Sequence, residues 1–136
     1  GKMTKEEKTK AEEAESENKE LLDFITETLD GKITSTKISH KLKSHPVCLT
    51  TDGSISLDME KYFRDMPADD GKIKAQRVLE LNASHPVFST IKATYENDKE
   101  KAAVYAKVLY AQSQIIAGIM PENPMELTDL ICSLIK

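Results

Sequence analysis

The sequence predicts an α+β fold: a small three-stranded sheet with covering helices and a C-terminal helical layer. Two observations predict it. Short segments rich in β-branched residues lie between longer segments whose apolar residues recur at helical spacing. Because three strands form a stable sheet only when one face is covered, we expect the helices at residues 54–66 and 86–95 to be the covers. Residues 99–136 then supply the helical layer.

Residues 1–17 form a polar lead-in, and an amphipathic helix follows it. The lead-in is almost wholly Glu, Lys, Ala, Ser and Thr, so it is either a solvated helix or disordered. We expect the helix to begin within this run, because apolar residues recur at helical spacing from Leu21 to Leu29. Gly31 is the expected C-cap residue. The chain therefore divides into the lead-in and one domain over residues 18–136.

Residues 33–42, 47–51 and 77–82 are the predicted strands. The first alternates and is rich in Thr and Ile, the second is short and ends at Asp52-Gly53, and the third combines Val and Leu with polar neighbours. Periodicity alone also allows a helix for the third segment.

The helix over residues 54–66 carries flexible and aromatic apolar side chains. Ser54 is its expected N-cap, and residues 67–71 form the polar loop that follows. Methionine suits surfaces that accept varied partners, but an apolar helical stripe is more often core, so the residues alone favour docking on the sheet. The face consists of Ile55, Met59, Tyr62, Phe63 and Met66.

The helix over residues 99–118 has two apolar stripes, about 130° apart around its axis. A helix with two stripes is expected to be buried on two sides. One stripe is Ala102, Tyr105, Ala106, Leu109 and Ile116, and the other is Val104, Val108, Ala111 and Ile115.

The final helix has strong start signals and a broad apolar face. Asn123 can cap it, Pro124 suits its first position, and Glu126 can complete a capping box. Little chain is left to cover this face and both stripes of the preceding helix, so a second copy of the chain is an alternative cover. The face consists of Leu127, Leu130, Ile131, Leu134 and Ile135.

Composition excludes several classes of function. Charged residues are 31% of the 136 residues, and the net charge of −4 gives no electrostatic footprint for nucleic acid. No apolar run is long enough for a membrane span, and no signal-peptide pattern is present. We expect a cytoplasmic protein in which Cys48 and Cys132 are buried, reduced thiols. His40, His45 and Cys48 match no common zinc spacing, and we find no catalytic motif.

Several motifs in the right order resemble the bacterial ninety-kilodalton heat-shock chaperone family. Residues 77–87 look like its ELNxxHP segment, and residues 105–113 resemble its LLYDQA segment. Glu122-Asn123-Pro124, followed by an apolar helix, resembles the family's ending. Further matches are residues 20–25, residues 37–42 and the Thr50-Thr51-Asp52 turn before a Met-containing helix. Together the motifs cover about residues 18–136.

The resemblance implies the C-terminal domain of that chaperone, which is the family's constitutive dimerisation module. The last two helices would pair with those of a second copy in a four-helix bundle. This part of the protein would be no enzyme and hold no cofactor, since ATP and magnesium bind other domains of the full-length chaperone. The implied partners are a second copy and unfolded or partly folded client proteins, with no nucleic acid and no membrane.

The resemblance also implies roles for individual residues. Either stripe of the helix over residues 99–118 could face the partner copy. A stand-alone homodimeric adaptor and a small enzyme without a recognisable motif remain alternatives. The implied dimer interface is Tyr105, Val108, Leu109, Gln112, Ile115, Ile116, Leu127, Leu130, Ile131 and Leu134. The implied client contacts are Ile55, Met59, Tyr62, Phe63 and Met66.

Overall fold

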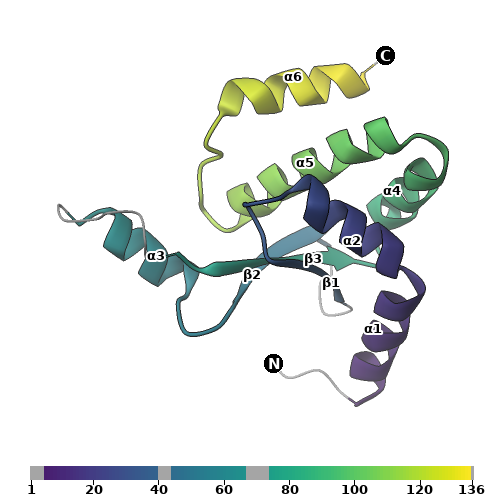
Figure 1. Ribbon diagram of the computed structural model, residues 1–136, viewed down its shortest axis with the longest axis horizontal. Helices are drawn as coiled ribbons and strands as arrows, with labels where there is room; N and C mark the ends of the chain where they lie inside the picture. The colour runs from purple at the N-terminus through teal and green to yellow at the C-terminus, as the bar shows by residue number, and fades with distance from the viewer. Residues whose placement is uncertain (1–4, 40–43, 67–73, 136) are drawn as a thin grey trace.

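The computed structural model describes residues 5–39, 44–66 and 74–135, and it confirms the α+β class (Figure 1). The elements are α1 (Lys5–Glu17), α2 (Lys19–Thr28), β1 (Ser35–Ser39), β2 (Val47–Asp52), α3 (Leu57–Arg64), β3 (Gln76–Asn82), α4 (Pro86–Asn97), α5 (Lys99–Ile116) and α6 (Pro124–Leu134).

The sheet has the strand order β1-β3-β2. Strand β3 runs parallel to β1 and antiparallel to β2, so Leu81 lies opposite Ile38 on one side and Val47 on the other. The segment that periodicity left open between strand and helix is therefore the central strand. The first strand is shorter than predicted, and residues 40–42 of that prediction lie outside the described residues.

Helices α2 and α5 cover the sheet, and the prediction that the helices at 54–66 and 86–95 do so is wrong. Helix α2 packs beside β1, whereas α5 packs beside β2, and their apolar residues share one core with the strands. A sheet of three strands, spaced about 5 Å apart, is only wide enough for two helices of about 10 Å diameter. Helix α4 packs instead against α5, and α3 projects away from the body (Figure 1).

The prediction that the amphipathic helix begins within the lead-in is wrong. The lead-in forms a separate helix, α1, which ends one residue before Asn18, and α2 begins one residue after it. The side chain of Asn18 is buried, and its Nδ2 donates to the carbonyl of Ala14 at 2.8 Å. The Glu15 carboxylate accepts from the backbone N–H of Ile38, so α1 also packs against β1. At the other end of α2, Leu29 is the C-cap residue and Gly31 follows with a φ of 79°.

Of the predicted first residues of α3 and α6, the structure confirms only that of α6. The start of α3 is two residues later than predicted, because Ser56 rather than Ser54 caps it and accepts from the N–H of Met59. The start of α6 is as predicted, with Asn123 accepting from the N–H of Glu126. Helix α6 lies on the far side of α5 from the sheet (Figure 1), and none of its residues is buried.

Candidate functional site

Helix α5 divides its apolar residues between the core and the surface. Ala102, Ala106 and Leu109 are buried, and the latter two belong to the core shared with the sheet. At the end of the second stripe, Ile115 is 56% exposed. The middle of the first stripe therefore packs in the chain's own core, but neither stripe is wholly buried or open: Ile116 of the first is exposed, and Ala111 of the second is buried.

The residues predicted for a dimer interface differ in the surface that they offer. Leu109 is 4% exposed, so its side chain has almost no surface for a partner, and no direct contact is expected from it. Ile131 on α6 is 41% exposed. Gln112, Ile115 and Ile116 are also exposed, whereas Tyr105, Val108, Leu127, Leu130 and Leu134 are half-buried.

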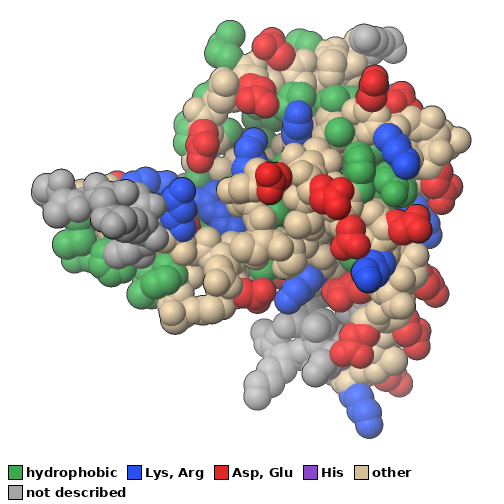
Figure 2. All heavy atoms as spheres, in the orientation of Figure 1, with side chains coloured by type: hydrophobic (Ala, Val, Ile, Leu, Met, Phe, Trp, Pro, Cys, Tyr) green, Lys and Arg blue, Asp and Glu red, His purple; other side chains and the backbone are tan. Residues whose placement is uncertain are grey.

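Helix α3 presents its apolar face to solvent, so the interpretation that this face docks on the sheet is wrong. No residue of α3 is buried; Tyr62 is 64% exposed and Met59 41%. Met66, just after the helix, is also exposed, while Phe63 and Ile55 are half-buried. The rings of Tyr62 and Phe63 meet edge to face with centroids 5.6 Å apart. Figure 2 shows the hydrophobic side chains gathered on the side of α3 away from α6.

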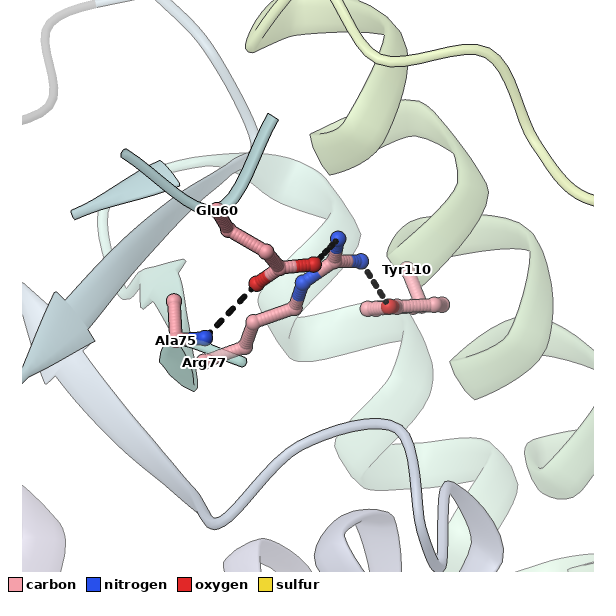
Figure 3. A network of polar contacts seen from close by, with 4 residues as sticks. All are labelled: Glu60, Ala75, Arg77 and Tyr110. Carbon is pink, nitrogen blue, oxygen red and sulfur yellow. Dashed lines mark hydrogen bonds and ion pairs between the residues drawn. The ribbon is translucent and has the colours of Figure 1, made fainter. Parts of the chain in front are cut away.

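One polar network connects α3 to the body of the domain (Figure 3). The guanidinium of Arg77, on β3, donates to Glu60 Oε1 at 2.9 Å and to the Tyr110 hydroxyl at 2.8 Å. The other carboxylate oxygen of Glu60 accepts from the N–H of Ala75 at 2.8 Å. The side chains of Arg77 and Glu60 are only 11% and 12% exposed. Because Tyr110 lies on α5, the network joins α3, the central strand and α5.

Burial and charge perturb the ionisable groups of this network. Burial lowers the pKa of Arg77, but the adjacent Tyr110 and Glu60 outweigh it, so the pKa lies above its ordinary value. Burial also raises the pKa of Tyr110, although the neighbouring Arg77 acts in the opposite direction. The hydroxyl therefore stays protonated and can accept a hydrogen bond from Arg77 over the whole neutral range.

The raised pKa of Tyr110 predicts a loss of stability in alkali. Below the unfolded value of about 10, both states hold the phenolic proton; above it, the unfolded state loses its proton first. The free energy of unfolding should therefore fall as the pH rises from about 10 through the folded pKa. Urea unfolding at about pH 9 and about pH 11 measures this fall. Tyr110→Phe should show a shallower fall, and an equal slope in both proteins would contradict the assignment.

The network borders a cleft between α3, β3, α5 and α6, with a volume of about 440 Å³. Sequence reasoning missed both network and cleft, because no spacing rule connects residues as far apart as Glu60, Arg77 and Tyr110. Half-buried Leu127 and Leu130 line the cleft on the side of α6.

The cysteines do not both have the predicted environment. Cys48 is half-buried, and burial, followed by the charge of Glu80, raises its pKa. Cys132 is exposed on α6, so the prediction that it is buried is wrong; both thiols are free. Within the described residues, no group of His, Cys, Asp and Glu could hold a metal ion, and His40 lies outside them. No helix in that part of the chain is long and apolar enough to cross a bilayer.

An α+β domain whose helices expose apolar faces is typical of a protein-interaction module. The profile of the Hsp90 protein family matches residues 2–136, and the chain belongs to this family. It is 44% identical to chaperone protein HtpG of Clostridium acetobutylicum over 96% of the chain, and 42% identical to that of Bacillus subtilis over 95%. HtpG of Halalkalibacterium halodurans is 45% identical over 85%. The chain spans only 18–21% of the length of these curated relatives.

Proposed function

We propose that the chain is the C-terminal domain of a cytoplasmic, ATP-dependent chaperone, where it holds two protomers together and contacts client proteins. Membership of the Hsp90 family and the name of the HtpG relatives support a chaperone. The observation that carries the dimer is the exposure of large aliphatic side chains on two neighbouring helices: Ile115 and Ile116 on α5, and Ile131 on α6 with Ile135 just after it. Isolated monomers rarely leave such a surface uncovered.

The proposed role of the dimer is mechanical. Helices α5 and α6 of each copy would form a four-helix bundle, and the side of α5 with half-buried Val108 and exposed Ile115 would face the partner. Joining the protomers raises the effective concentration of their remaining domains for each other. ATP and magnesium would bind those other domains, so this domain would itself catalyse no reaction.

Sedimentation equilibrium of the 136-residue chain tests the dimer. We expect a dimer at micromolar concentration, because a four-helix interface buries enough apolar surface for stable association. A monomer across the whole micromolar range would contradict the proposal.

The proposed client contact is the exposed face of α3. Met59 and Tyr62 on α3, and Met66 just after it, are exposed, and no residue of this helix is buried by the part of the chain that the structure describes. Methionine and aromatic side chains adapt to varied apolar sequences, which suits a surface that holds unfolded chains. Because these side chains are not part of the core, changing them should affect binding rather than folding.

Replacing Met59 with serine is therefore expected to weaken the binding of an unfolded client by about tenfold, and to change the free energy of unfolding by less than about 0.5 kcal/mol. Fluorescence anisotropy with a labelled, permanently unfolded polypeptide measures the first, and urea unfolding the second. Met120→Ser is the matched control, since Met120 is exposed outside α3. A large loss of stability in Met59→Ser, with client binding unchanged, would instead place Met59 in the core.

A further inference from the structure

The cleft beside α3 has a charge opposite to that of the chain as a whole. The chain has a net charge of −4, yet among the described residues more cations than carboxylates line the cleft. The cations are Lys32, Arg64, Lys74, Arg77 and Lys107, and the carboxylates are Glu60, Glu122 and Glu126. Figure 2 shows Lys and Arg side chains between the base of α3 and α6.

Most of this positive charge is not neutralised within the cleft. Glu60 is committed to Arg77 in the ion pair at 2.9 Å. No ion pair joins Lys32, Arg64, Lys74 or Lys107 to a described carboxylate. Four cations then face the two remaining carboxylates. Cations gathered in one concavity produce a local positive potential even in an acidic protein, because the walls of a cleft focus the field.

The basic cleft and the apolar face lie on different sides of α3 and come closest at Glu60 and Phe63. Glu60 and Arg64 line the cleft, and they lie one helical turn apart on α3. Phe63 of the apolar face is three residues from Glu60, so the two are neighbours on the helix surface. A chain segment lying across α3 can therefore place apolar side chains on Met59 and Phe63 and reach the cleft with side chains a few residues away.

We propose that α3 and the cleft together select a particular class of client segment: aromatic or aliphatic residues followed closely by Asp or Glu. This inference rests on the proposed client contact at α3 and adds the charge of the client to it. Apolar contact alone would not discriminate between acidic and basic flanks. The charge of the whole chain would favour basic flanks, so a preference for acidic flanks must come from the cleft.

Two synthetic unfolded peptides test the inference. They have equal length and the same Phe, Leu and Tyr positions, with Glu in one and Lys in the other at the flanking positions. At low salt the Glu peptide should bind the 136-residue chain about tenfold more tightly, as expected from several partly exposed ion pairs. Salt at about 1 M should remove most of this preference, since it screens charges beyond a few ångströms.

Cleft variants locate the source of the preference. Arg64→Gln and Lys107→Gln should each reduce the preference for the Glu peptide severalfold and leave the affinity for the Lys peptide unchanged or higher. Lys92→Gln is the matched control, because Lys92 is exposed on α4 and does not line the cleft. It removes the same charge and should leave the preference intact.

The remaining outcomes separate this inference from the function on which it rests. Equal binding of both peptides, or tighter binding of the Lys peptide, overturns the charge selection and leaves the client contact standing. Binding of neither peptide overturns the client contact, and the charge selection with it. Displacement of the Glu peptide by millimolar inorganic phosphate or free glutamate overturns the inference in favour of a small-anion site. A preference that Arg64→Gln and Lys107→Gln leave unchanged places the selection outside the cleft and overturns it too.

Discussion

Aspartate in place of Ile131 is expected to convert the proposed dimer into a monomer. Ile131 is exposed on α6 of the single chain, so the substitution leaves the core of each protomer intact. In a two-fold symmetric interface the same change occurs twice. Each copy then buries a carboxylate at an apolar seam without a partner, at a cost of at least about 2 kcal/mol. The two carboxylates together cost about 4 kcal/mol, so the dimer dissociation constant, measured by sedimentation equilibrium, should rise by roughly a thousandfold.

Other exposed apolar side chains provide a second test position and a control for this experiment. Ile115→Asp on α5 should have the same effect, since Ile115 is more exposed than Ile131. Met66→Asp, which also replaces an exposed apolar side chain, should leave the dimer intact and weaken only client binding. Leu130 and Leu134 are less suitable positions, because both are half-buried within one chain. A dimer that persists in both isoleucine variants would show that the chains associate through another surface.

The second large effect is expected from Arg77→Met. The side chain of Arg77 is the charged partner of Glu60, and both are almost buried. Its removal leaves the Glu60 carboxylate without a cation and the Tyr110 hydroxyl without its donor. The loss should be about 3 kcal/mol in the free energy of unfolding, measured by urea denaturation. The amides of α3 should also exchange faster with solvent, since the Glu60 contacts attach this helix to the body.

An exposed ion pair of the same chain is the matched control. Lys37 and Asp52 are 3.8 Å apart, and about half of each side chain is exposed. Lys37→Met should therefore change stability by less than about 1 kcal/mol. Combining Arg77→Met with Glu60→Gln should recover part of the loss, because no unpaired charge then remains. Equal effects of Arg77→Met and Lys37→Met would refute a structural role for the network.

Local signals predicted much of the secondary structure. Asn123 followed by Pro124 identified the start of α6, because the cap and the fixed proline angle act within one turn. The third strand was predicted at nearly its observed limits. The break at Asn18 was not, because what distinguishes this asparagine is its burial, which depends on how the rest of the chain folds.

The exposure of α3 could not be predicted from local sequence patterns. Its face of Met59, Tyr62 and Phe63 has the pattern of a core helix, and the residues alone favoured docking on the sheet. Helix α3 is left exposed because the apolar residues of α2 and α5 already pack on the apolar face of the three-stranded sheet. Competition between helices for the same surface is not encoded in the periodicity of any one of them.

The sequence by itself determined the α+β class, the family and the amphipathic character of each helix, because composition, motifs and apolar spacing are properties of single segments. Only the tertiary structure decided which residues of the two α5 stripes are buried, that α3 is left exposed, and that Glu60, Arg77 and Tyr110 meet beside a basic cleft. The physical reason is that the burial of a side chain and its hydrogen-bond partners depend on segments far apart in the sequence. Which helix face is buried depends on the surface that the other elements leave uncovered.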